Sequence, residues 1–575
     1  MPIFTFVWSA CAVSAKGGHC YLWRSRQECY TEQVGLGCKS RRKKSVCPKR
    51  LPWSTSTKVK RRARCSWRCS CTPTRPNRLN TNYAVAGSLR AVPGIDLQLT
   101  PQERICGPHA IQLDTRFSYK QLRVIQMDEH QMFRGNSAGD GPLLYDFDEQ
   151  AISKKDFIKG VWARTESWPL SNARGERTGT GMTTLQDARG GGKRRFAVPY
   201  YCNIGFLVYR DGLSEVVNTL LESRASDRDH GEGRSRFSSA REQDWARLQT
   251  AVENNSLGED LDWRLIAALS DEFEWQSAKD TLPLALSQMG LDKERACLFE
   301  YPGWSEENYN VLFLEILLWL ISPENLSASA VAESADWILR DDAVEAGVLF
   351  WRLCRPAFLR SDEAKAPPNK FARDWLAARD SDVLGWYSIR SVQSNALVWR
   401  HWFSSLNQLT VNMSTQLHQL NVVPLPGEIA VSGDWYMAVL ANSALPEAGL
   451  QLINNLVSPA AELDRLRRGI GLPTRRSFYR DETAPNATVG AALSVLPQLS
   501  FRVPKPKIMQ LLDRACRRSE IPDYPNKSFA LSAGLRRILE FEPKDGALDE
   551  VARYVRSTLA AVASQVAFAG RNRET

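Results

Sequence analysis

The chain has 575 residues, of which 43% are hydrophobic and 24% are charged. This length favours three or four domains of about 150 residues each, and the apolar content excludes a wholly disordered chain. The longest apolar run, Val311–Ile321, is shorter than the roughly 20 residues that span a bilayer and contains Glu315. A polytopic membrane protein is therefore excluded.

The net charge of +11 is concentrated near the N-terminus. The first 95 residues hold 19 Lys and Arg against two acids, whereas the rest of the chain, the body, carries a net charge of −6. Because a mildly acidic surface does not attract a phosphate backbone, the body is not expected to bind nucleic acid. Eight of the 13 cysteines lie in the first 71 residues, and the five scattered ones of the body indicate buried thiols.

Residues 1–80 are interpreted as a basic, Cys-rich, disordered extension. Other readings stay open: the apolar stretch Met1–Ala15 resembles a weak signal peptide, although no basic residue precedes it. The cysteines at 65, 69 and 71 do not have the spacing of a zinc site. Basic clusters such as Lys58–Arg64 would bind an anionic surface, and nucleic-acid binding by this extension alone would weaken steeply with salt.

From about Tyr83 onward, the chain has the pattern of an alternating α/β protein. A helix-like stretch at 84–91 leads into a strand at 95–99, and a second strand is predicted at 122–127. The run Phe196–Tyr209 is rich in β-forming residues, and its Pro199 favours a crossing between units over a simple central strand. A further strand is predicted at 421–426.

Helices dominate the second half of the chain. Apolar residues at helical spacing predict them at 245–254, 309–321, 329–339, 343–355, 446–456, 459–468, 504–517 and 548–569. Trp399 and Trp402 are placed on one helical face, with Arg400 and His401 between them. Residues 170–195 and 222–243 are polar and glycine- or serine-rich, and are predicted as surface loops.

The segment Phe196–Leu213 resembles the hinge of bacterial extracellular solute-binding proteins of family 1, the sugar-binding receptors of ABC importers. Those proteins read Ala-Val-Pro-Tyr-Tyr-x-Asp-x-Gly, where this chain has Asn203 in place of the Asp. Four further segments match in the family's order. They are 93–97, 301–319, 423–435 and 443–479, the last containing Gly-Leu-Pro-Thr-Arg.

The matches cover roughly 480 residues, with two departures. No clear first strand and helix precede Ala84, and the Trp element expected after the hinge survives only around Trp245. The resemblance implies an α/β fold with two lobes, of the type II periplasmic-binding-protein kind, that close over a ligand. We expect lobe 1 at 81–202 and 427–472, and lobe 2 at 203–426 and 473–570.

Sugars have apolar faces and hydroxyl rims, so a receptor needs flat aromatic rings with carboxylates and Arg around them. Where the family lines its cleft, the candidate ligand-binding residues are Trp435, Tyr201, Asp128, Glu129, Trp304, Arg475 and Asp434. Each has a structural alternative. The rings would pack in the core, Tyr200 competes with Tyr201 because side chains alternate along a strand, and the charged groups would form salt bridges.

No enzyme motif is found. The chain has no Gly-x-Ser-x-Gly, no His-Glu-x-x-His and no P-loop, since Gly190–Lys193 lacks the spacing and precedes a strand. The six His residues are not spaced as metal ligands. We therefore expect a non-catalytic protein without cofactor or metal.

The leading hypothesis is an extracytoplasmic, monomeric receptor that captures a mono- or oligosaccharide for ABC-type import, with an ABC permease as its partner. The resemblance implies this function and location. The alternative is an interaction protein on the same periplasmic-binding fold without a transport role, which the missing first element favours. Ligand-induced closure distinguishes the two, because only a receptor with an intact cleft should show it.

Overall fold

The computed structural model describes most of the body and one short segment near the N-terminus. The described residues are 6–12, 95–101, 121–128, 144–145, 147–148, 151–165, 194–229, 242–254, 257–278, 282, 286–287, 289, 291, 296–300, 306–321, 337–360, 396–404, 406, 420–440, 443, 445–467, 471–480, 499–518, 524–544 and 547–571.

The described strands form two larger sheets and one small one. The first sheet has the order β2-β1-β3-β11-β6, with β1 (Phe6–Ala12), β2 (Ile95–Pro101), β3 (Gln121–Asp128), β6 (Val198–Tyr201) and β11 (Trp435–Val439). Its last strand, β6, contains Pro199. Proline lacks the N–H that a central strand needs, so it is tolerated at this edge. A β-bulge at Trp435 and Tyr436 marks the pairing of β11 with β6.

The second sheet has the order β12-β10-β7-β9-β8. Its strands are β7 (Gly205–Arg210), β8 (Cys297–Glu300), β9 (Ala396–Trp402), β10 (Leu420–Pro424) and β12 (Leu499–Phe501). Every residue of β7 and of β9 is buried. Strands covered on both faces read as continuous apolar runs rather than as an alternation, which explains the unbroken Phe206–Tyr209 run. A two-stranded sheet pairs β4 (Phe147–Asp148) with β5 (Arg194–Arg195).

The described helices include most of the predicted ones and others, such as α7 and α20, that the sequence analysis did not predict. The α-helices are α3 (Lys159–Ala163), α4 (Leu213–Asp229), α5 (Glu242–Glu253), α6 (Leu257–Asp260), α7 (Trp263–Ala278), α9 (Glu306–Ile321), α11 (Asp341–Arg360), α16 (Pro446–Leu456), α17 (Pro459–Arg467), α19 (Lys505–Arg514), α20 (Tyr524–Glu540) and α21 (Leu548–Arg571). Short 3₁₀ turns are η3 (Trp337–Leu339), η4 (Pro426–Glu428) and η5 (Arg476–Tyr479).

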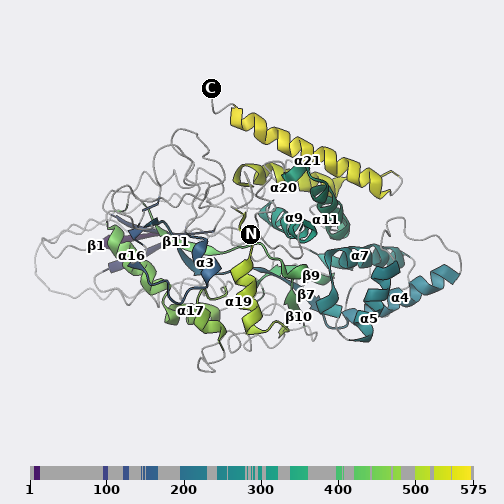
Figure 1. Ribbon diagram of the computed structural model, residues 1–575, viewed down its shortest axis with the longest axis horizontal. Helices are drawn as coiled ribbons and strands as arrows, with labels where there is room; N and C mark the ends of the chain where they lie inside the picture. Colours follow the sequence, from purple (N-terminus) through teal and green to yellow (C-terminus); the bar gives the residue numbers. More distant parts are fainter. Residues whose placement is uncertain are drawn as a thin grey trace, which may run out of the picture. The chain divides into compact units, whose positions relative to one another are not determined.

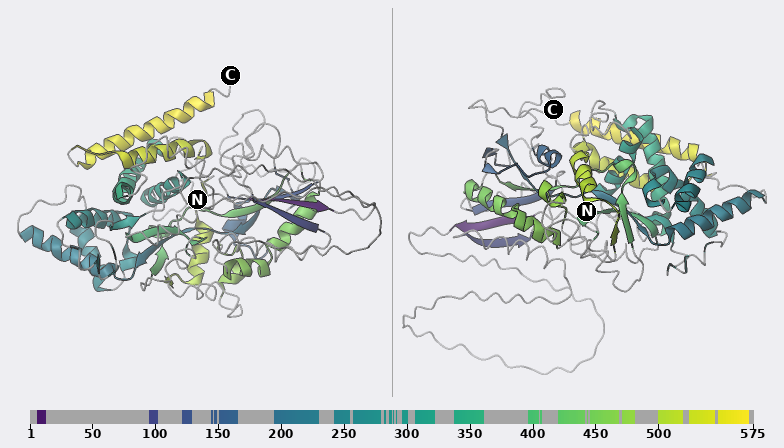
Figure 2. Two further views of the ribbon diagram at one scale, coloured as in Figure 1. Left: turned by 180° about the vertical axis from the view of Figure 1, so that it is seen from behind. Right: turned by 60° about the horizontal axis from the view of Figure 1, so that its bottom comes forward.

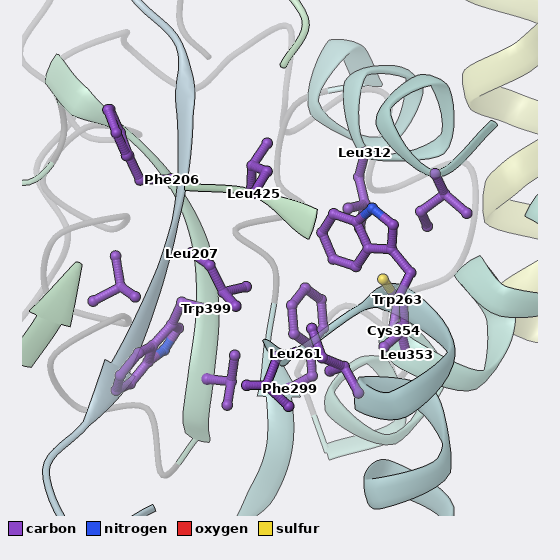
Figure 3. Packing of buried hydrophobic residues seen from close by; sticks show 14 of the residues in the cluster. Phe206, Leu207, Leu261, Trp263, Phe299, Leu312, Leu353, Cys354, Trp399 and Leu425 are labelled. Atoms are coloured by element: carbon purple, nitrogen blue, oxygen red, sulfur yellow. The ribbon is translucent and has the colours of Figure 1, made fainter. Parts of the chain in front are cut away.

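The helices that accompany the second sheet form its main core. Helices α9, α11, α20 and α21 pack on one another, and α7 and α11 pack on β8 (Figures 1 and 2). Trp263 meets Phe299 edge-on at 6.1 Å between ring centroids, close to Cys354 on α11 (Figure 3). In the first sheet, α16 packs on β3 and β11. Helix α9 is buried over most of its length, since it lies inside this cluster.

As predicted, the fold is α/β and is built on two sheets. The strands and helices predicted at 95–99, 122–127, 421–426, 245–254, 309–321, 343–355, 446–456, 459–468, 504–517 and 548–569 are confirmed within a few residues. The helix predicted at 329–339 is described only as η3. The predicted stretch 84–91 lies outside the described residues, as does the loop at 170–195 up to β5.

Two predictions about local structure are wrong. Residues 396–402 form strand β9 rather than a helix, so Trp399 and Trp402 lie on opposite faces of the sheet. Two tryptophans three residues apart suit one helical face, but this short run is fully buried in the sheet, and period alone does not separate a buried strand from a helix. The loop predicted from 222 is also wrong at its start, because α4 continues to Asp229.

The N-terminal part differs from expectation at one point. Phe6–Ala12, assigned to the extension, forms strand β1 of the first sheet. Residues 13–94 lie outside the described residues, so the prediction of a disordered extension stays a prediction. Apart from β1, the strands of the first sheet fall within 81–202 and 427–472, and those of the second within 203–426 and 473–570. The assignment of whole lobes stays a prediction.

Candidate functional site

Two adjacent stretches of chain connect the two sheets. The first, residues 202–204, joins β6 to β7, and the second, residues 425–434, joins β10 to β11. We call them the crossing segments. The Gly433 N–H donates to the carbonyl of Asn203 at 2.8 Å, and the Asn203 N–H donates to the Asp434 carboxylate at 3.1 Å. The two crossing segments are thus hydrogen-bonded to each other.

Two further stretches of chain, around Leu472 and around Cys516, join this pair. Cys202 and Leu472 exchange two backbone hydrogen bonds at 2.8 and 2.9 Å. Ser432 donates to the carbonyl of Cys516 at 2.8 Å, and Cys516 donates to Ala430 at 2.9 Å. Segments from distant parts of the sequence therefore meet at the crossing segments.

A buried ion pair ties helix α3 to the second crossing segment. The Arg164 guanidinium donates to the Asp434 carboxylate and to the carbonyl of Leu512, near the end of α19. Arg164 is 3% exposed and Asp434 is 0% exposed. At the other end of α3, the Gly160 N–H donates to the Asp513 carboxylate at 2.6 Å. Each carboxylate oxygen of Asp434 thus accepts a hydrogen bond from the protein, one from Arg164 and one from the Asn203 N–H.

A second buried ion pair contacts the second crossing segment. Arg400 on β9 donates to both carboxylate oxygens of Glu315 on α9, at 2.9 and 2.5 Å, and both side chains are fully buried. The Val431 N–H also donates to Glu315, at 3.4 Å. Burial raises the pKa of Glu315, and Arg400 opposes that rise. The Arg400 guanidinium lies 3.8 Å from the centroid of the Trp402 ring.

Trp435 and Tyr201 form one stacked pair. Their ring centroids are 5.8 Å apart with an interplanar angle of 25°, and they are 4% and 8% exposed. Gly471 lies against the Tyr201 ring so closely that a Cβ there would be 2.3 Å from a ring carbon. Tyr200 stacks on a different partner, since the Arg465 guanidinium lies 4.1 Å from its ring centroid.

The structure brings four of the predicted site residues to one place. Trp435 at the start of β11 is in register with Asp128 at the end of β3 and with Tyr201 at the end of β6. Asp434 precedes Trp435 directly. The ends of three neighbouring strands therefore meet beside the crossing segments.

Arg475 lies over Phe157, which belongs to the same hydrophobic cluster as Trp435 and Tyr201. Its guanidinium donates to the carbonyl of Val457 at 3.1 and 2.7 Å, lies 3.3 Å from the Glu462 carboxylate, and covers the Phe157 ring at 4.5 Å. Thr474 also donates to Glu462, from its hydroxyl at 2.8 Å and from its N–H at 2.9 Å. The Pro-Thr-Arg loop is thus fixed to helix α17.

The remaining two predicted residues, Glu129 and Trp304, lie outside the described residues. Ligand binding by any of the seven predicted residues stays a prediction. The structure adds residues that the sequence analysis did not select, namely Arg164, Glu315 and Arg400. No local pattern could have found the Arg164–Asp434 pair, because its members are 270 positions apart.

The described residues lack two further features. They contain no group of three or more His, Cys, Asp and Glu side chains that could hold a metal ion. None of the described helices combines the length and the apolar character that crossing a bilayer requires.

Comparisons with known proteins find similarity only at the level of solved structures. No family model matches the chain, and no curated protein matches it. The GacH receptor of Streptomyces glaucescens is 13% identical over 85% of this chain and 95% of its own, with a TM-score of 0.45. UgpB of Mycobacterium tuberculosis, in complex with glycerophosphocholine, is 12% identical over 81% and 87%, with a TM-score of 0.41.

Thiaminase I of Bacillus thiaminolyticus is similar too, at 13% identity over 79% of this chain and 98% of its own, with a TM-score of 0.39. Its name is that of an enzyme. At TM-scores below 0.5 these likenesses carry no conclusion about what this chain binds. The similar solved structures are mostly sugar-binding proteins, the group that the sequence segments resemble.

Proposed function

We propose that this protein is a non-catalytic, extracytoplasmic receptor that captures a carbohydrate between two α/β lobes for ABC-type import. The observation that carries the proposal is the pair of crossing segments. They lie side by side, hydrogen-bond to each other through Asn203, Gly433 and Asp434, and lead from one sheet to the other. Two lobes joined in this way can change their angle by small backbone rotations at the crossing segments.

The aromatic pair beside the crossing segments supports a carbohydrate as the ligand. Trp435 and Tyr201 offer flat rings at the ends of adjacent strands. Asp128 is the register partner of Trp435, and Asp434 precedes Trp435 in the sequence. Stacking on an aromatic ring suits the apolar face of a sugar, and carboxylates suit its hydroxyl groups. Glu129, Trp304 and Arg475 complete the proposed ligand-binding set. An ABC permease is the proposed partner.

One observation favours the alternative, an interaction protein on this scaffold without a transport role. Trp435 and Tyr201 stack on each other and are nearly buried, and Asp434 and Arg475 already have protein partners. A ligand that used these groups would have to replace contacts that the protein makes with itself. Binding measurements therefore decide between the two functions.

The test is a thermal-shift screen of the full chain against mono- and oligosaccharides, polyols and amino acids, followed by calorimetric titration of the hits. A ligand that binds only the native state adds about 2.7 kcal/mol at a hundredfold excess over its Kd. Scattering measurements with and without the ligand then report closure as a smaller radius of gyration. A folded sample that binds no sugar would overturn the receptor proposal.

A matched pair of variants locates the site. Trp435→Phe keeps an aromatic ring in the core but changes the surface offered to a sugar, so it should weaken sugar binding by about tenfold or more. Trp337→Phe makes the same change at a tryptophan that is 0% exposed in the other core cluster. It should lower stability without changing the Kd. Equal Kd values for the two variants would remove Trp435 from the site.

A further inference from the structure

Strand β1 occupies an internal position of the first sheet. It pairs antiparallel with β2 over seven residues, from Phe6 with Pro101 to Ala12 with Ile95. On its other edge it pairs antiparallel with β3, from Val7 with Ile125 to Cys11 with Gln121. In this sheet β2 has no other neighbour among the described strands. Without β1, β2 would lose the one ladder it has among the described strands, and β3 would gain an open edge.

The attachment of β1 to the sheet comes from these two ladders. The main contacts of β1 are with β2 and β3, and residues 13–94 separate it from β2 in the chain. β1 belongs to the unit that consists of Met1–Ala12 and Asn77–Thr575. Among the described residues, the main contacts of β1 are thus with strands that lie far from it in the sequence.

A strand held in this way is equivalent whichever copy of the chain supplies it. The backbone hydrogen bonds of a ladder depend on register and direction and not on which chain the strand belongs to. The effective concentration of a tethered segment falls with the length of its connection, so a chain's own strand has a smaller advantage over residues 13–94 than it would have over a short turn. At high protein concentration a strand from a second copy can compete for the same position.

We propose that Phe6–Ala12 is a donor strand, and that the slot between β2 and β3 accepts it from the same chain or from a second copy of this chain. Exchange of this strand between two copies produces a strand-exchanged dimer. The partner is thus another molecule of the same protein, and the contact is the β1 ladder itself. The proposal does not depend on ligand binding between the lobes.

The first experiment disables the strand in the full chain. Ser9 pairs with Gln98 on one edge and with Arg123 on the other, so Ser9→Pro removes a ladder donor from an internal strand. Ile3→Pro, outside β1, is the matched control. Hydrogen exchange in β2 and β3 should become about tenfold faster or more in Ser9→Pro and stay unchanged in Ile3→Pro. Unchanged protection in both variants would overturn the proposal.

The second experiment supplies the strand from outside. A peptide of residues 1–15 with a benzophenone at position 8 is added to the Ser9→Pro chain. It should restore protection in β2 and β3 and cross-link near Leu99 and Val124, the register partners of Trp8. A scrambled peptide should do neither. If Ser9→Pro also loses protection in β7 and β9, the variant has unfolded as a whole, and the peptide is then added before refolding. Failure of the peptide to restore protection in β2 and β3 under that condition counts against the proposal.

The third experiment tests exchange between copies. The wild-type chain is refolded at low and at high concentration and examined by size-exclusion chromatography with light scattering. Dimer should form at high concentration for wild type and Ile3→Pro, and be lost in Ser9→Pro. Identical mass distributions for all three chains would refute strand exchange. Absence of sugar binding would leave this result unaffected, so the two proposals fail separately.

Discussion

His401 lies inside strand β9 with an imidazole that is 2% exposed. Neither ring nitrogen has a hydrogen-bond partner among the described residues. Burial, with a smaller contribution from the Arg400 charge, lowers the pKa of His401 to about 3. The neutral ring is therefore strongly favoured in the folded protein, whereas in the unfolded chain the ring protonates near pH 6.5.

This difference predicts a loss of stability in mild acid. A pKa that is lower in the folded state contributes stability above pH 6.5, and that contribution is lost as the pH falls toward 3. Between pH 7.5 and 5 the loss should be about 2 kcal/mol. His401→Leu should remove it and raise stability at pH 7.5, because two buried nitrogens no longer lack partners. Urea unfolding at both pH values measures this.

The control for His401 is its register neighbour Phe206 on β7. Phe206→Leu changes core packing without changing a titratable group, so it should lower stability by the same amount at both pH values. If His401→Leu also shifted both values equally, the imidazole would not be the source of the acid sensitivity.

Asp271 on helix α7 predicts the opposite pH dependence. Arg352 on α11 donates to its carboxylate at 2.9 and 2.6 Å, yet burial outweighs this pairing and raises the pKa of Asp271 from 3.8 to about 6. A raised pKa contributes stability that is full below pH 3.8 and is lost as the pH rises through 6. The loss should be about 3 kcal/mol.

Asp271→Asn should therefore flatten the stability profile between pH 4 and 6. Asp341→Asn is the control on α11, because that carboxylate is 88% exposed. Its removal should change the profile little. Chemical unfolding at intervals of half a pH unit gives both profiles, and a wild-type slope that persists in Asp271→Asn would show that another group causes it.

At the scale of elements, the Glu315–Arg400 pair joins α9 and β9 to the second crossing segment through Val431. Removing one partner leaves a buried charge without its counter-charge, so Arg400→Met should cost about 3–5 kcal/mol. Combining it with Glu315→Leu should recover most of that loss, because two apolar side chains replace two buried charges. A double-mutant cycle of unfolding free energies measures the coupling.

The exposed pair of Lys507 and Glu428 provides the comparison. Their side chains are 30% and 42% exposed, and solvent screens their attraction, so Lys507→Met should change stability by less than about 1 kcal/mol. If Arg400→Met and Lys507→Met had similar effects, burial would not be what makes the Glu315–Arg400 pair matter.

At the scale of the whole molecule, the chain divides into two units. One contains Met1–Ala12 and Asn77–Thr575, and the other is Val13–Pro76, which lies in the strongly basic part of the sequence. Replacing residues 13–76 by a flexible Gly/Ser linker keeps β1 and should leave the melting temperature of the first unit unchanged. Any affinity for a polyanion should be lost with the basic unit.

Calorimetry and a salt titration of binding to duplex DNA test this. Binding by the intact chain should fall steeply as salt rises, and the shortened chain should bind weakly at all salt concentrations. A shortened chain that kept salt-sensitive binding would place the anion-binding surface on the body, against its net charge of −6.

Local signals in the sequence determined much of the architecture. Apolar periodicity predicted α9, α11, α16, α17 and α21, and the position of Pro199 indicated that the chain leaves the first sheet there. These signals are readable because backbone propensity and side-chain period act within one element. They also indicated that Asp128, Tyr201 and Trp435 belong to one group, through a resemblance between segments rather than through contacts.

Only the tertiary structure decided which surfaces meet. Trp399–Trp402 became part of a strand because the centre of the second sheet buries both faces of that run. Arg164 found Asp434 across 270 positions, and β1 entered the first sheet far from β2 in the chain. Such pairings depend on how whole elements pack. The spacing of neighbouring residues therefore does not reveal which charges become buried together or which strands become internal.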